Sequence, residues 1–144
     1  MNWNLSEIYK ALNIKTKIQK NFEFDSISID SRKIKKNNFF IPIKGNNFNG
    51  HKFINDVEKN GVKACLIEKK ESQFIECKKI LKIIVRDTKE ALIKLAEYAR
   101  ERSTLTSFIC ITGSSGKTTL KEWIQIILKE NYKSYCNPGS CSFP

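Results

Sequence analysis

The sequence predicts an α/β protein built in two parts, and two observations carry that prediction. Over the first hundred residues, short segments with the apolar pattern of strands alternate with segments whose apolar residues recur at helical spacing. Further on, an apolar run at 108–111 leads through a glycine-containing turn into an amphipathic helix. We therefore expect a small N-terminal α/β domain, followed by the first strand, loop and helix of a second α/β domain.

Three stretches of the first part have helical periodicity. The first follows Asn4, whose side chain can form a capping box with Glu7. The second can end at Gly61, and the third opens at Asp87. Their predicted apolar faces are Leu5, Ile8, Tyr9 and Leu12; Phe53, Ile54 and Val57; and Ala91, Leu92, Leu95, Ala96 and Ala99.

Four stretches between and before these helices read as strands. Residues 26–30 alternate polar and apolar side chains, as a half-buried strand does. The other three predicted strands are 39–43, 62–67 and 80–85. In the second part we expect strands at 108–111 and 132–136, the second following the amphipathic helix whose apolar face contains Leu120, Trp123, Ile124, Ile127 and Leu128.

The turn between the apolar run and this helix, residues 112–119, reads Thr-Gly-Ser-Ser-Gly-Lys-Thr-Thr. Backbone N–H groups of such a turn and of the first helical residues can bind phosphate oxygens. Lys117 can reach terminal phosphates, and the Thr118 hydroxyl can ligate Mg²⁺. The spacing departs from G-x-x-x-x-G-K-[ST], because Ile111 stands where the first glycine belongs. The alternative is a glycine turn followed by a lysine and a threonine that bind nothing; the strand–turn–helix context favours a nucleotide site.

We therefore predict ATP and Mg²⁺ as cofactors. Lys117 is the candidate catalytic residue and Thr118 the candidate metal ligand. The candidate phosphate-binding residues are Gly113, Ser114, Ser115, Gly116, Lys117, Thr118 and Thr119.

Composition limits the other classes of function. The net charge is +11 over 144 residues, but the lysines are scattered and form no long basic block, so we expect neither a nucleic-acid nor a membrane partner. The chain has no signal-peptide pattern, which favours a cytoplasmic location. No cysteine pair has C-x-x-C spacing, and Cys65 and Cys110 lie in apolar patterns expected to be buried. His51 is the only histidine, which excludes a multi-histidine metal site.

The 112–119 turn resembles the ATP loop of the Mur ligases, T-G-[TS]-x-G-K-[ST]. A second likeness is Asp30-Ser31-Arg32, then the 39–43 strand, then a Gly-x-x-x-x-Gly-His-x-Phe loop at 45–53. The resemblance implies that 1–103 is a UDP-sugar substrate-binding domain with Ser31 and Arg32 at the uridine-diphosphate site. It implies that 104–144 is the start of the central ATP-binding domain, a P-loop ATPase domain that is truncated here.

Ser114-Ser115, with Lys121-Glu122 downstream, look most like the family member that joins D-alanyl-D-alanine to UDP-N-acetylmuramoyl-tripeptide through an acyl phosphate. Two alternatives stay open: the relative that adds the third amino acid to the dipeptide substrate, and a non-catalytic UDP-sugar-binding module. The resemblance also implies that the general base and further Mg²⁺ ligands lie outside these residues, so we expect the 144-residue chain to mark a truncation or a shifted frame and not to turn over by itself.

Three positions depart from the family pattern. Asn37 and Asn38 stand where Gly and Asp are usual, and Asn49 stands where Asp usually precedes Gly-His. Read without the resemblance, Asp30-Ser31-Arg32 is a turn with a surface charge pair. His51 has two readings as well: a substrate contact, or a residue that only caps its helix or satisfies a loop carbonyl.

Overall fold

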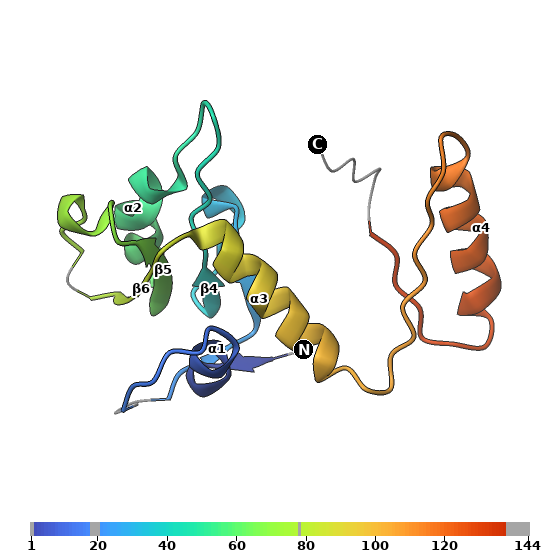
Figure 1. Ribbon diagram of the computed structural model, residues 1–144, viewed down its shortest axis with the longest axis horizontal. Coiled ribbons are helices and arrows are strands. Elements are labelled where there is room, and N and C mark those ends of the chain that lie inside the picture. Colours follow the sequence, from blue (N-terminus) through green and yellow to red (C-terminus); the bar gives the residue numbers. More distant parts are fainter. Residues whose placement is uncertain (1, 18–20, 78, 138–144) are drawn as a thin grey trace. The chain divides into compact units, whose positions relative to one another are not determined.

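The computed structural model describes residues 2–17, 21–77 and 79–137. The chain divides into two compact units, Met1–Thr104 and Leu105–Pro144, and each is treated by itself. Figure 1 labels the α-helices of both units and several strands of the first unit.

The first unit is built on a four-stranded parallel sheet with the order β3-β4-β5-β6. The strands are β3 (Ser26–Ser28), β4 (Asn38–Phe40), β5 (Ala64–Glu68) and β6 (Leu81–Val85). All four predicted strands are confirmed, and the α/β class with them; β3 and β4 are shorter than the sequence pattern suggests. Because neighbours in the sheet are also neighbours in the sequence, the order of the described strands never reverses, so they contain no topological switch point.

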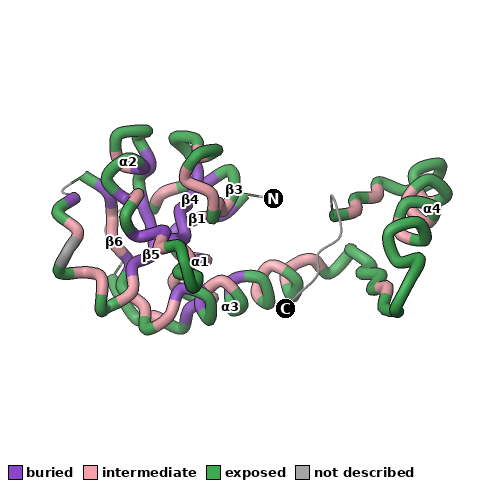
Figure 2. The backbone as a smooth tube through the Cα atoms, turned by 90° about the horizontal axis from the view of Figure 1, so that it is seen from above, coloured by how far each residue is buried: buried purple, intermediate pink, exposed green. Residues whose placement is uncertain are grey.

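The two faces of this sheet carry separate hydrophobic cores. Adjacent residues of a strand point to opposite faces, so Phe39 and Phe40 enter different cores. One core packs α1 (Leu5–Ala11) and α3 (Thr88–Glu101) against the sheet, and the other packs α2 (Ile54–Lys59). Figure 2 shows the buried residues concentrated in the strands between these helices. Burial on both faces explains why β5 reads as a continuous apolar run.

The helix signals of the sequence are confirmed in detail at the amino ends. Asn4 and Glu7 form the predicted capping box of α1. Asp87 caps α3 by accepting from the backbone N–H groups of Lys89 and Glu90, at 2.7 and 3.0 Å. Short 3₁₀ turns add η1 (Ser31–Lys33), η2 (Gly50–Phe53) and η3 (Ser72–Phe74).

The predicted apolar stripe of α3 is wrong at one position. Ala96 is exposed, and the partly buried Tyr98 packs against the core instead, 6.0 Å between ring centroids from Trp3. Trp3 belongs to β1 (Trp3–Asn4), which pairs antiparallel with β2 (Glu23–Phe24). These two-residue strands are too short to leave a period in the sequence, and they bring an aromatic ring under the end of α3.

The second unit contains one described helix, α4 (Lys117–Lys129), as predicted. The strands expected at 108–111 and 132–136 are wrong, because the structure assigns no strand within 105–137. An apolar run becomes a strand only where a neighbouring strand takes up its backbone groups. No residue of α4 is buried, and Trp123 and Ile127 are 63% and 66% exposed.

Of the two cysteines that we expect to be buried, one is buried and one is exposed. Cys65, in the centre of β5, is buried, and burial raises the pKa of its thiol to about 12. Cys110 is exposed, which contradicts the expectation of a buried thiol, because the 108–111 strand that contains it does not form. No helix in the described ranges is long and apolar enough to cross a membrane.

Candidate functional site

The carboxyl ends of the four parallel strands lie at one edge of the sheet. Open α/β sheets bind ligands at this edge, and here the site has to come from the segments after the strands, because the described strands contain no switch point. The segment after β3 contains the candidate residues Ser31 and Arg32, at the start of η1. The segment after β4 is the loop 41–50, and Glu68 is the last residue of β5. The segment after β6 leads into Thr88, the first residue of α3. Parallel topology therefore gathers four sequence-distant segments on one edge of the first unit.

Arg32 is paired with Asp30 through its planar guanidinium. Nε and Nη2 donate to the two carboxylate oxygens of Asp30 at 2.9 and 3.0 Å, and the backbone N–H of Arg32 donates to Oδ1 at 3.0 Å. These hydrogen bonds lower the pKa of Asp30 to about 2 and raise that of Arg32. The Arg32 side chain is 85% exposed. The pair has the geometry of the surface charge pair, and it also orients an exposed cation after β3.

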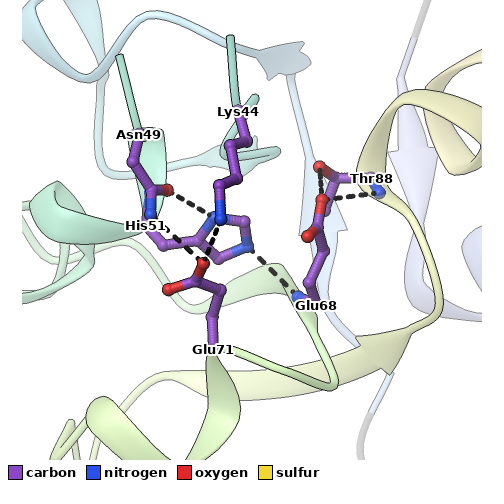
Figure 3. Close-up of polar contacts among 6 residues, drawn as sticks. All are labelled: Lys44, Asn49, His51, Glu68, Glu71 and Thr88. Atoms are coloured by element: carbon purple, nitrogen blue, oxygen red, sulfur yellow. Dashed lines mark hydrogen bonds and ion pairs between the residues drawn. The ribbon is translucent and has the colours of Figure 1, made fainter. Parts of the chain in front are cut away.

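His51 lies at the centre of a hydrogen-bonded network on the same edge (Figure 3). The residue is 3% exposed. Nδ1 lies 2.9 Å from Asn49 Oδ1, and Nε2 accepts from the backbone N–H of Glu68 at 3.1 Å. The ring satisfies a backbone group, as the second reading of His51 expects, but that group is the N–H of Glu68 at the end of β5 and not a loop carbonyl. No contact between His51 and a substrate is needed to explain its burial.

The network continues on both sides of His51. Glu71 Oε1 accepts from Asn49 Nδ2 at 3.2 Å and from Lys44 Nζ at 3.0 Å. Glu68 Oε1 accepts from the hydroxyl and the backbone N–H of Thr88 at 3.0 and 3.4 Å. The hydrogen bond from Lys44 leads the causes that lower the pKa of Glu71, and the same contact raises that of Lys44.

No sequence pattern marks four further residues of this edge, Lys44, Glu68, Glu71 and Thr88. Their partners lie up to 27 residues away, and no local pattern links a glutamate in the 68–71 segment to a loop asparagine. The one hint in the sequence is Asn49, which stands where the family usually has an aspartate. Its amide accepts from His51 and donates to Glu71, and an aspartate could not donate to that carboxylate.

The departure at Asn38 has a similar local explanation. Its side chain accepts from the backbone N–H of Lys35 at 2.7 Å and donates to Ser26 Oγ at 2.7 Å. Neither Asn37 nor Asn38 has a positive φ, since Asn13 is the only non-glycine residue in the described ranges that does. Asn38 therefore holds the turn before β4 through hydrogen bonds and not through left-handed geometry.

The second candidate site, residues 113–119, lies in the other unit. Gly113 and Gly116 have φ angles of 151° and 72°, which favour glycine. Gly116 is the residue before the first turn of α4, and no side chain caps that helix. Lys117 Nζ donates to the carbonyl oxygens of Gly113 and Ser114, so its ammonium folds back over the turn. Every residue from 112 to 119 is exposed.

This loop fits an anion better than it fits a metal ion alone. The first N–H groups of an α-helix have no partner inside the helix, and here they also lack a capping side chain. Thr118 is the metal-ligand candidate of the loop. Within the described ranges, no three His, Cys, Asp or Glu side chains lie close enough to hold a metal ion together. A metal at this loop would therefore depend on Thr118 together with oxygens of a bound nucleotide.

Comparison with known families decides the affiliation of the chain. Residues 23–100, more than half of the sequence, match the model of the Mur ligase family, catalytic domain. The chain belongs to the Mur ligase family. The match ends before residues 113–119, so it bears on the first unit.

The curated relatives of this Mur ligase chain extend the similarity. It is 34% identical over 140 residues, 97% of its length, to the UDP-N-acetylmuramoyl-tripeptide–D-alanyl-D-alanine ligase of Rickettsia prowazekii, of which it covers 30%. Over 105 residues, 72% of its length, it is 40% identical to the UDP-N-acetylmuramoyl-L-alanyl-D-glutamate–2,6-diaminopimelate ligase of Aquifex aeolicus, of which it covers 21%. The chain thus spans less than a third of the length of these relatives.

Solved structures show the same fold. A crystal structure of MurF from Acinetobacter baumannii matches 91% of the chain with a TM-score of 0.75 and 30% identity, and the chain covers 28% of it. A MurF ligase from Thermotoga maritima in complex with ADP matches 74% of the chain with a TM-score of 0.57 and 30% identity, and the chain covers 23% of it.

Proposed function

We propose that this chain supplies the substrate-binding domain and the first ATP-binding segment of a ligase that joins D-alanyl-D-alanine to UDP-N-acetylmuramoyl-tripeptide. The observation that carries the proposal is the similarity to the Rickettsia prowazekii ligase, which runs through 97% of the chain and so includes both units. In this proposal, residues 1–103 bind the UDP-sugar and residues 104–144 begin the ATP-binding domain.

The first unit supports the nucleotide-sugar half of the proposal. Ser31 and Arg32 follow β3 at the carboxyl edge of the sheet, where a diphosphate would meet an exposed guanidinium. Asp30 fixes the direction of that guanidinium through two hydrogen bonds. We assign Arg32 to the diphosphate, because its planar donors suit phosphate oxygens, and Ser31 to a polar edge of the uridine.

The second unit supports the ATP half. The uncapped start of α4 and the two glycines with positive φ form a turn whose N–H groups can bind phosphate oxygens. Lys117 would exchange its carbonyl contacts for the terminal phosphates and stabilise charge on the phosphoryl group in transfer. Thr118 would help to hold Mg²⁺, which neutralises phosphate charge when bound.

The proposed reaction has two steps. The carboxylate of the UDP-sugar peptide attacks the γ-phosphate of ATP, which forms an acyl phosphate and releases ADP. The amine of D-alanyl-D-alanine then attacks the acyl carbon, and inorganic phosphate leaves as the C–N bond forms. The residues of this chain act in the first step, by binding both reactants and stabilising the transferred charge. We propose turnover for the whole ligase and not for these 144 residues alone.

The similarity to diaminopimelate-adding ligases favours a second candidate, the addition of the third amino acid. Two hybrid enzymes separate the candidates. In one, this chain replaces the matching 140 residues of the Rickettsia prowazekii ligase; in the other, it replaces the matching 129 residues of the diaminopimelate ligase of Listeria monocytogenes. Each hybrid is assayed for ADP release with its host's own substrates.

The proposal predicts ADP release that depends on D-alanyl-D-alanine from the first hybrid and little or none from the second. Activity of the Listeria hybrid alone would favour the second candidate. Soluble, folded hybrids that bind the UDP-sugar but release no ADP in either host would support a non-catalytic binding module.

A further inference from the structure

The hydrogen bonds around His51 fix the position of every proton in its part of the network. The backbone N–H of Glu68 can only donate, so Nε2 of His51 must be the acceptor of that 3.1 Å contact. The imidazole proton therefore sits on Nδ1, which donates to Asn49 Oδ1 at 2.9 Å. The backbone N–H of His51 donates to the same oxygen at 3.1 Å, so the Asn49 amide has one orientation, with Nδ2 toward Glu71.

This arrangement joins the loop after β4 to the end of β5. Asn49 belongs to the loop and pairs with Lys44 in an isolated bridge, while Glu68 is the last residue of β5. The connection runs through the ring of His51, a buried residue. Lys44, Asn49 and Glu71 form one side of the connection, and Glu68 with Thr88 at the start of α3 forms the other (Figure 3).

We propose that His51 is a positioning residue that holds the 44–50 loop at the carboxyl edge of the sheet only while its imidazole is neutral, so that nucleotide-sugar binding at this edge weakens when His51 takes up a proton. This inference rests on the proposed function, since it deepens the assignment of the same edge to the UDP-sugar. Protonation would place Nε2–H against the backbone N–H of Glu68, and two donors cannot share that contact.

The charged groups around the His51 ring shift its pKa in opposite directions. Glu68, at the end of β5, and Glu71, in the β5–β6 connection, favour the charged imidazole, whereas Lys44, in the loop, disfavours it. Burial is the largest cause and lowers the pKa of His51. The contact is thus intact at neutral pH and is lost as the pH falls through a value below the ordinary histidine pKa of about 6.5.

The first half of the inference is that the His51 imidazole is neutral and carries its proton on Nδ1 at pH 7. Nuclear magnetic resonance of the 144-residue chain tests this directly. Because His51 is the only histidine, the two imidazole ¹⁵N signals need no assignment by mutation. We expect the Nδ1–H tautomer at pH 7, with a pyridine-type Nε2, and a titration midpoint below that of a free histidine. The Nε2–H tautomer, or a midpoint at or above the free value, would overturn the inference.

The second half is that protonation of His51 weakens nucleotide-sugar binding. Calorimetric titration with UDP-N-acetylmuramoyl-tripeptide between pH 5 and 8 tests it. Its diphosphate is a diester and gains no proton in this range. We expect the wild-type Kd to rise by up to about tenfold for each pH unit below the His51 midpoint. In His51→Gln, an acceptor at the position of Nε2 remains and cannot titrate, so the Kd should stay constant over the same range.

The outcomes separate the inference from the function on which it rests. Binding with the same pH dependence in wild type and His51→Gln would overturn the inference and leave the proposed UDP-sugar site intact. Absence of binding by wild type at every pH would overturn the UDP-sugar site, and with it the link between His51 and binding. If His51→Gln does not fold, the tautomer and midpoint of the wild-type chain still decide the first half.

Discussion

The guanidinium of Arg102 lies over the indole ring of Trp3, with Cζ 4.1 Å from the ring centroid. Arg102 also forms an ion pair with Glu7 of α1 and donates to the carbonyl oxygen of Asn2 at 3.1 Å. The side chains of Arg102 and Glu7 are 18% and 25% exposed. Arg102, the residue after the end of α3, therefore fastens that helix to Asn2, Trp3 and Glu7.

We expect Arg102→Ala to destabilise the first unit by about 2 kcal/mol, because it removes both a stacked cation and charge-assisted hydrogen bonds. Arg102→Lys is the matched control: it keeps the charge but loses the planar fork, and should recover part of the loss. Urea unfolding followed by tryptophan fluorescence measures both. Equal stability of wild type and Arg102→Ala would show that the contact contributes nothing.

The ion pair of Arg102 and Glu7 also makes the stability of the first unit depend on pH. Burial raises the pKa of Glu7, but the hydrogen bonds from Arg102 and the Asn4 backbone, with nearby positive charge, lower it overall. A depressed carboxyl pKa means that the stabilisation is complete above the unfolded pKa and is lost as the pH falls through the folded value. Glu7→Gln should remove this loss of stability at acid pH, measured as the free energy of unfolding by urea at a series of pH values. The same decline of stability with falling pH in the variant and in wild type would contradict a contribution from Glu7.

Gly50 is required by close approach and not by its φ angle. A Cβ at this position would lie 2.9 Å from the backbone nitrogen of Ile43 and 3.0 Å from the Cα of Pro42. We expect Gly50→Ala to cost about 1–3 kcal/mol through displacement of the backbone. Gly45→Ala, in the same loop, has its nearest atom at 3.9 Å and should be close to neutral. Thermal unfolding of the two variants compares them, and equal melting temperatures would contradict the packing argument.

Arg32→Ala should weaken binding of UDP-N-acetylmuramoyl-tripeptide about tenfold or more, since it removes charge-assisted hydrogen bonds to phosphate. Lys59→Ala is the matched control: it removes the same charge from the last residue of α2, which leads into the amino end of β5. Calorimetry on the full chain measures both. Equal Kd values for wild type and Arg32→Ala would remove Arg32 from the site.

Hydrogen exchange should differ sharply between the two units. β5 is paired on both sides and covered on both faces, so its amides should exchange slowly. An isolated helix of the length of α4 is marginal in water, and Leu120, Trp123 and Ile127 are about half exposed or more. Amides of α4 should therefore exchange fast in the isolated chain. Protection of α4 equal to that of β5 would contradict this account.

Local signals predicted most of the fold of the first unit. The capping box of Asn4 and Glu7, and the cap at Asp87, depend on residues within three positions, so the sequence carries them directly. The stripe of α3 was misread at Ala96 because which residue faces inward depends on Trp3, far away in the chain. The 108–111 run was misread because a strand depends on a neighbour that its own pattern does not contain.

The candidate edge was predicted only in part for the same reason. Ser31 and Arg32 follow a recognisable strand. Glu71 meets Lys44 and Asn49 only after the sheet has formed, across more than 20 residues of sequence. Its role follows from topology, and no pattern in the 68–74 segment identifies it.

Binding of ATP phosphates by residues 113–119 is best tested in the Rickettsia hybrid that carries Lys117→Ala. ADP release dependent on D-alanyl-D-alanine should fall at least 10²-fold, because a group that stabilises charge in phosphoryl transfer is lost. Lys129→Ala, at the other end of α4, should keep the activity of the parent hybrid. Parental rates in Lys117→Ala, with the helix content unchanged, would contradict phosphate binding by this loop.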